Sequence, residues 1–126
     1  MDARELLNYK NWVVVGDVLN GEKYSYKILN ALKGANFNVL GINPRDNSGK
    51  VYKTLEEVPY KVDVIDLCIN PISGLKVIEK AITLGINKVL IQPGASSNEI
   101  LSLCENKGII AIEGCALVEL SHYNSK

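Results

Sequence analysis

The sequence predicts a Rossmann-like, doubly wound α/β domain, with a mainly parallel five-stranded sheet and helices on both faces. Along the 126 residues, short β-branched apolar runs alternate with segments whose apolar residues recur at helical spacing. The strand-like runs are almost continuously apolar, which is typical of parallel strands covered on both faces. The short connections favour right-handed β-α-β units, so the chain is expected to wind a single open sheet.

Five runs are expected as strands because each is short, apolar and stopped by a glycine, a proline or a turn. They are residues 12–16, 38–43, 62–69, 88–91 and 109–112. Pro44 ends the second run, since a proline cannot extend the hydrogen-bond ladder. Val51 and Tyr52 are expected to form a minor strand.

The helices are predicted from apolar spacing and from capping residues at their ends. The first covers residues 22–34 and ends at Gly34. Thr54 caps one helical turn, Ser73 is expected to cap a helix ending at Gly85, and Ser97 caps a helix ending at Gly108. Residues 1–10 are expected as a short peripheral N-terminal helix. With no linker or low-complexity tract, residues 1–126 are predicted to form a single domain.

Composition argues against several classes of function. The 14 basic and 14 acidic residues give zero net charge, which argues against a nucleic-acid partner. No apolar run approaches the roughly 20 residues of a membrane helix. Three cysteines without a C-x-x-C pair favour the reducing cytoplasm. With His122 as the only histidine, neither a metal site nor a set of catalytic residues is predicted.

Residues suited to ligand contact gather at the predicted carboxyl ends of the strands. In an open parallel sheet, ligands bind beyond these ends, where the strand order reverses. Glycine admits a ligand close to the backbone, proline fixes a loop, and carboxamides form hydrogen bonds. A ligand crevice is therefore predicted from the segments Gly16-Asp17, Asn43-Pro44-Arg45, Asn70-Pro71 and Gln92-Pro93-Gly94.

The first loop and the second strand end indicate what kind of ligand this would be. The Gly16 loop opens a helix, whose free N–H groups suit a phosphate, although the loop lacks the dinucleotide fingerprint. Asp17 would repel an anion, so it is expected to face away or to cap. Arg45, with Lys50 nearby, suits an extra ribose phosphate, as in NADP or coenzyme A; a solvated loop arginine is an equal alternative.

A further set of segments occurs in a fixed order along the chain: Val14-Val15-Gly16, Tyr24-Ser25-Tyr26, Gly41-Ile42-Asn43-Pro44-Arg45, Val51-Tyr52 with Leu55, Val62-Asp63-Val64-Ile65-Asp66, Gln92-Pro93-Gly94-Ala95 and Glu113-Gly114-Cys115. In this order and spacing the segments resemble the small single-domain CoA-binding proteins, which are similar to the CoA-binding domain of the succinyl-CoA synthetase α subunit. The resemblance implies that the Gly16 loop and Tyr24-Ser25 meet phosphates. It implies that Asn43-Pro44-Arg45 lies by the adenosine and its 3′-phosphate. It also implies that Asn70-Pro71 and Gln92-Pro93-Gly94 line the pantetheine path.

The function expected from these observations is binding of coenzyme A or an acyl-CoA without chemistry of the protein's own. An enzyme that uses NADP or an acyl-CoA is one alternative. A degenerate nucleotide-binding domain that contacts other proteins is another, and Asp17 in the phosphate loop is its best support. The sequence leaves open a homodimer and a redox role for Cys115.

Overall fold

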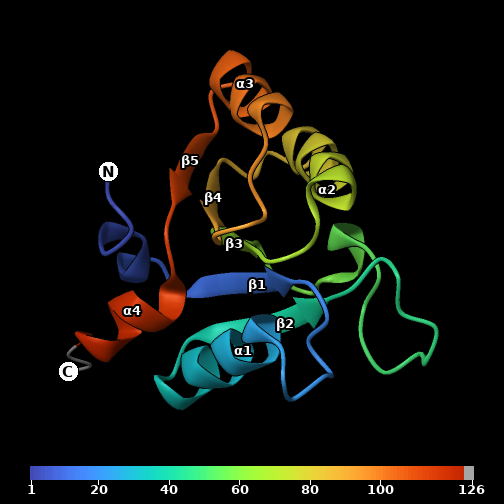
Figure 1. Cartoon of the computed structure of the whole chain (residues 1–126), viewed down its shortest axis with the longest axis vertical. Helices are drawn as coiled ribbons and strands as arrows, with labels where there is room; N and C mark the ends of the chain where they lie inside the picture. The colour runs from blue at the N-terminus through green and yellow to red at the C-terminus, as the bar shows by residue number, and fades with distance from the viewer. Residues whose placement is uncertain (124–126) are drawn as a thin grey trace.

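The structure, a computed structural model, describes residues 1–123 as a central sheet between two helical layers (Figure 1). The elements are η1 (Glu5–Asn8), β1 (Asn11–Val15), α1 (Tyr24–Gly34), β2 (Asn38–Ile42), η2 (Leu55–Glu57), β3 (Val64–Leu67), α2 (Pro71–Thr83), β4 (Lys88–Ile91), α3 (Asn98–Asn106), β5 (Ile110–Glu113) and α4 (Ala116–Ser121). The predicted Rossmann-like fold class is thereby confirmed. Among these residues, none of the helices has the length and apolar character needed to cross a membrane.

The sheet has five parallel strands in the order β2-β1-β3-β4-β5. The chain adds β2 on one side of β1 and then crosses to place β3 on the other side. The strand order therefore reverses between β1 and β3. The last residue of β1, Val15, pairs with Ile42 of β2 and with Leu67 of β3. These three adjacent strands thus end level with one another, which makes this edge the expected place for a ligand.

Each face of the sheet has its own apolar core. On one face, α2 and α3 pack over side chains such as Val13, Ile65 and Ile91. On the other face, α1, α4 and η1 cover Trp12, Val14, Val64 and Leu90. Successive side chains of a strand point to opposite faces. This alternation decides which residues at the strand ends share a side of the sheet.

One predicted helix start is wrong. The sequence predicts Ser73 as the cap, but α2 begins at Pro71 and its cap is Asn70, whose side-chain oxygen accepts a hydrogen bond from the Ser73 N–H at 2.9 Å. Proline is common at the first helical position because the N–H that it lacks would have no partner within the helix there. The predicted caps Ser97 and Thr54 are confirmed. The minor strand is a single bridge between Ile42 and Tyr52.

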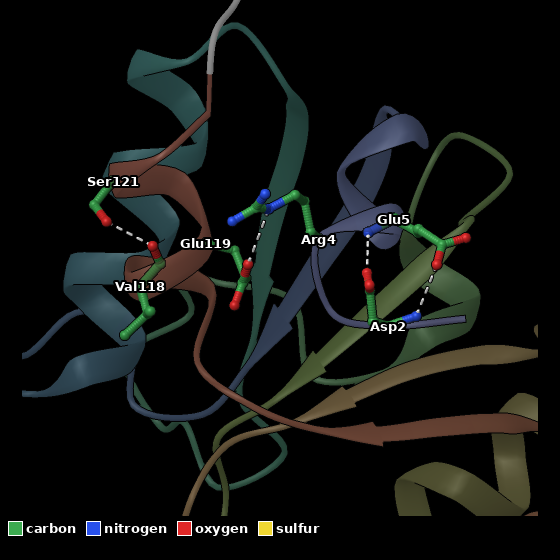
Figure 2. Close-up of polar contacts among 6 residues, drawn as sticks. All are labelled: Asp2, Arg4, Glu5, Val118, Glu119 and Ser121. Carbon is green, nitrogen blue, oxygen red and sulfur yellow. Dashed lines mark hydrogen bonds and ion pairs between the residues drawn. The ribbon is translucent and has the colours of Figure 1, made fainter.

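The N-terminal segment lies against α4. Where a short helix was predicted within residues 1–10, the structure has the 3-10 helix η1 over Glu5–Asn8, in which Leu6 and Leu7 are buried. Figure 2 shows its polar contacts: the N–H groups of Asp2 and Glu5 each donate to the other residue's carboxylate. Arg4 forms an ion pair with Glu119 of α4 at 3.7 Å. This surface pair contributes little energy, so the buried leucines hold the segment in place.

Candidate ligand-binding site

The carboxyl edge of the sheet is a hydrogen-bonded row of backbone. One residue beyond the strands, the N–H groups of Gly16, Cys68, Gln92 and Gly114 each donate to the last carbonyl of the neighbouring strand, at 2.8 to 3.0 Å. The ladder therefore continues past the strands into the loops. Residues far apart in the sequence are fixed side by side at this edge.

A pocket of about 820 Å³ opens above this row, and we call it the strand-end pocket. Its volume lies within the usual range for small-molecule sites. It is lined by Asp17, Lys23, Tyr24, Ser25, Asn43, Arg45, Asp46, Asn47, Cys68, Ile69, Asn70, Gln92, Pro93 and Cys115. The lining therefore comes from the segments that follow all five strands and from the start of α1.

Most of the residues predicted from sequence meet at this pocket. Those that line it are Asp17, Tyr24, Ser25, Asn43, Arg45, Asn70, Gln92 and Pro93. Pro44 instead lines a smaller neighbouring pocket, which Arg45 shares. Gly16, Lys50, Pro71 and Gly94 lie outside the lining. A role in ligand binding stays a prediction for all thirteen residues.

Gly16 acts beneath the pocket, by allowing close packing. A Cβ atom at this position would lie 3.1 Å from the Cβ of Ser25 and 3.2 Å from the Cβ of Cys68. Real Cβ atoms rarely come so close to their neighbours. The missing side chain therefore lets the start of α1 approach the end of β3.

The start of α1 differs from the starts of α2 and α3. The side chains of Asn70 and Ser97 cap those two helices. The residue at the corresponding position of α1 is Lys23, which caps nothing, and the first turn of α1 contains no acidic residue. The N-terminal N–H groups of a helix carry partial positive charge and need partners. Because Lys23, Tyr24 and Ser25 line the pocket, this end of α1 is suited to an anion.

The Ser25 side chain forms a hydrogen bond with the loop between β1 and α1. Its hydroxyl donates to the carbonyl oxygen of Asp17 at 2.8 Å, and the residue is 4% exposed. A phosphate at this position would therefore meet backbone N–H groups rather than the Ser25 hydroxyl. Asp17 itself is exposed at the pocket and does not cap α1.

The rim after β2 is a loop held by its own side chains. The Asp46 carboxylate accepts hydrogen bonds from the Ser48 hydroxyl and from the N–H groups of Ser48 and Gly49. The Ser48 hydroxyl is the largest cause of the lowered pKa of Asp46, which is thus ionised at neutral pH. Asn43 accepts the Arg45 N–H. Within residues 1–123 the Arg45 guanidinium forms no ion pair, so it is available to an anion.

A buried carboxylate lies under the pocket on β3. Asp66 has no exposed surface, and its oxygens accept hydrogen bonds from the Cys68 thiol at 3.0 Å and from Nε2 of Gln92 at 3.0 and 3.2 Å. Burial raises the pKa of Asp66 to about 7, although both hydrogen bonds act in the opposite direction. Burial, with Asp66 beside it, raises the pKa of Cys68, which makes this thiol a weak nucleophile.

Sequence reasoning missed several residues of this site. Lys23, Asp46, Asn47, Cys68 and Ile69 all line the pocket, although the sequence did not single them out for ligand contact. Asp66 carried a signal, because a charged residue in the apolar run Val64–Leu67 requires a buried partner. Lys23 carried a weaker signal, as a poor capping residue just before a helix.

The fold and the pocket together define a Rossmann-like domain with a ligand pocket at the carboxyl ends of its strands. Comparison with known families gives the particular family: the model of the CoA binding domain matches residues 10–121, and the chain belongs to this family. The same match supports the CoA assignment and gives no support to NADP.

Solved structures agree with this fold. A conserved hypothetical protein from Pyrococcus furiosus is 36% identical, with a TM-score of 0.79 over 88% of this chain and 99% of its own. A hypothetical protein from Pyrococcus horikoshii OT3 is 24% identical, with a TM-score of 0.83 over 93% of this chain and 85% of its own. A dinucleotide-forming acetyl-coenzyme A synthetase from Ca. Korarchaeum cryptofilum is 22% identical, with a TM-score of 0.66 over 88% of this chain and 27% of its own.

Proposed function

We propose that the protein binds coenzyme A or an acyl-CoA in the strand-end pocket and carries out no chemistry of its own. The pyrophosphate lies at the start of α1, the adenosine and its 3′-phosphate lie by Asn43 and Arg45, and the pantetheine arm runs over Asn70 and Gln92. The observation that carries this proposal is the uncapped start of α1 at a pocket in a chain of the CoA-binding family. Free helix N–H groups and the Lys23 ammonium both suit a pyrophosphate.

Arg45 supports the position of the 3′-phosphate. It is exposed at the rim and shared by the strand-end pocket and its smaller neighbour. The smaller pocket is also lined by Lys53, Lys76 and Lys80 and by one acid, Glu56, which forms an ion pair with Lys80 at 3.3 Å, so the cations are in excess. Such a cationic border favours a ligand with a phosphate on its ribose over one with free hydroxyl groups.

A binding role is also supported by the state of the thiol and the acid under the pocket. The Cys68 thiol has a raised pKa, so it keeps its proton and donates a hydrogen bond to Asp66. The Asp66 carboxylate is fully buried and already receives two partners. Both groups therefore hold the floor together: Cys68 meets the pocket as a protonated thiol, and Asp66 is buried beneath it, so neither is well suited to act as a nucleophile or base.

Ligand affinity tests the proposal directly. Isothermal titration with CoA, acetyl-CoA, dephospho-CoA, NAD, NADP and ATP is expected to give the tightest binding for CoA or acetyl-CoA. At a hundred times its dissociation constant the preferred ligand should stabilise the protein by about 2.7 kcal/mol. A tighter complex with NAD, or no binding to any of these nucleotides, would refute the proposal.

The start of α1 allows a more specific prediction. Lys23→Asp places a good capping residue where the backbone is already extended, so the free protein should gain about 1 kcal/mol in its free energy of unfolding. The same carboxylate occupies the N–H groups and repels the pyrophosphate, so CoA affinity should fall more than tenfold. Denaturation in urea and titration with CoA measure the two effects.

Lys23→Gln serves as the control for charge, because it removes the ammonium without adding a strong cap. It is expected to weaken CoA binding less than Lys23→Asp and to leave the stability nearly unchanged. If Lys23→Asp stabilises the protein while CoA binds as tightly as to the wild type, the pyrophosphate does not bind at the start of α1.

A further inference from the structure

The contact between Asp66 and Gln92 fixes which way the Gln92 amide points. Leu90 of β4 pairs with Asp66 of β3, and Gln92 lies two residues beyond Leu90 on the same face of the sheet. Its Nε2 lies 3.0 and 3.2 Å from the two carboxylate oxygens of Asp66. Above the pKa of about 7 of Asp66, the carboxylate only accepts hydrogen bonds, so the amide group facing it must be the NH2. The NH2 of Gln92 is therefore directed into the protein.

The other end of this amide, Oε1, is then left for the pocket. Gln92 lines the strand-end pocket and is 6% exposed. Oε1 accepts none of the hydrogen bonds formed by residues 1–123. Within the same residues, no buried side-chain nitrogen or oxygen is without a partner. Oε1 is therefore accessible, and it is an acceptor at the floor of the pocket.

The Cys68 thiol strengthens this arrangement. It donates to Oδ1 of Asp66, the same oxygen that accepts the shorter bond from Gln92. Both neighbours of Asp66, the Cys68 thiol and the Gln92 amide, thus donate hydrogen bonds to its carboxylate. Neither can turn an acceptor toward Asp66 without placing two acceptors in contact. The whole group is tied to the sheet, because the backbone N–H groups of Cys68 and Gln92 belong to the row of hydrogen bonds at the strand ends.

We infer that Asp66 is a positioning residue that makes Gln92 Oε1 a hydrogen-bond acceptor for an amide N–H of the pantetheine arm. This inference rests on the proposed function, and it assigns to the floor of the pocket the selection of a ligand with an amide-bearing arm. The two amides of pantetheine supply N–H donors. A nucleotide without this arm has none to offer at that place. Asp66 thus acts through Gln92 and does not touch the ligand.

Asp66→Asn tests the inference, with CoA compared against adenosine 3′,5′-bisphosphate, which lacks the pantetheine arm. The introduced carboxamide donates as well as accepts, so it can hold Gln92 through Oε1 and turn the NH2 to the pocket. At pH 8.5, above the pKa of about 7 of Asp66, titration should show CoA affinity reduced about tenfold. Affinity for the bisphosphate should stay within about twofold.

Two further variants separate positioning from structural damage. Gln92→Ala should cost about as much CoA affinity as Asp66→Asn, and the double variant should cost no more than either one, since both changes remove the same acceptor. Asp63→Asn is the matched control: Asp63 precedes the same strand at the opposite edge of the sheet, where it accepts a hydrogen bond from the Asn11 N–H. This variant should bind both ligands like the wild type.

The outcomes distinguish the two proposals. If the wild type binds neither ligand, the proposed function fails, and the role of Gln92 toward pantetheine fails with it. If the wild type binds CoA but Asp66→Asn binds CoA equally well, only the inference about Asp66 is overturned. Equal losses for CoA and the bisphosphate, or additive losses in the double variant, would also overturn it, because they indicate general damage to the pocket.

Discussion

Asp66→Asn is expected to be more stable than the wild type at alkaline pH. Between pH 5 and pH 8.5, the free energy of unfolding of the wild type should fall by about 3 kcal/mol more than that of the variant. Burial raises the pKa of Asp66 from its ordinary value near 3.8 to about 7 in the folded state. Between these two pKa values the folded protein retains a proton that the unfolded chain has lost. The stability contributed by Asp66 is therefore present at low pH and is lost as the pH rises through 7.

Urea denaturation of both proteins at several pH values between 5 and 8.5 measures this effect. The free energy of unfolding of the wild type should fall relative to that of Asp66→Asn until the pH passes 7, and the difference should then stay constant. Asparagine has no ionisable group, so the free energy of unfolding of Asp66→Asn does not show this pH-dependent fall. Parallel curves would show that Asp66 has the same pKa in the folded and unfolded states.

Taken together, the two expectations for Asp66→Asn have opposite signs. The variant should be the more stable protein at pH 8.5 and the weaker binder of CoA. Polar groups that a function requires often lower stability, because they are held in apolar surroundings. A buried acid that lowers stability but orients a group at the pocket is an example of this relation.

Gly41→Ala is expected to destabilise the fold by about 1 to 3 kcal/mol and to weaken CoA binding in the same variant. A Cβ atom at Gly41 of β2 would lie 2.5 Å from Cγ2 of Val18. Val18 is only 2% exposed and belongs to the loop between β1 and α1. The valine must move, and it displaces the adjacent Asp17 and the start of α1. Urea denaturation and CoA titration measure the two losses.

Two companion variants check this explanation. Val18→Ala removes both γ carbons, so the double variant with Gly41→Ala should be more stable than Gly41→Ala alone. Gly34→Ala adds the same methyl group at the last residue of α1, where a Cβ has no neighbour within 4 Å. It should be neutral or slightly stabilising, because alanine favours the helix. A loss of stability in Gly34→Ala equal to that in Gly41→Ala would remove the contact with Val18 as the cause.

Most of the fold was predictable because the strands and most of the helices are encoded locally, although α4 (Ala116–Ser121) was not predicted. The apolar runs located all five strands, with ends that differ from the structure by one or two residues, as in β3 (Val64–Leu67) against the predicted 62–69. The predicted start of α2 was wrong because Asn70 and Ser73 are both good capping residues, and the sequence pattern did not distinguish them. Pro71 held the deciding information, since proline favours the first position of a helix.

The floor of the pocket was less predictable, because it depends on register between distant segments. Asp66 and Gln92 are 26 positions apart, and their contact requires Leu90 to pair with Asp66 across β3 and β4. Composition and apolar spacing do not tell which residues of β3 and β4 pair with each other. The edge itself was predictable, because carboxyl ends of parallel strands lie together whatever the register of individual pairs.

The row of backbone hydrogen bonds at the strand ends has a consequence for how related sequences can diverge. The row is made of backbone groups and does not depend on the side chains, so position 92 stays beside β3 when the surrounding side chains change. The loop after β2 depends mainly on Asp46 and its immediate neighbours. Under the proposed binding mode, substitutions in this loop should alter preference for the nucleotide end of the ligand while recognition of the pantetheine arm is preserved. This separation between the strand ends and the loop after β2 favours the evolution of relatives whose ligands share the pantetheine arm but differ in the nucleotide.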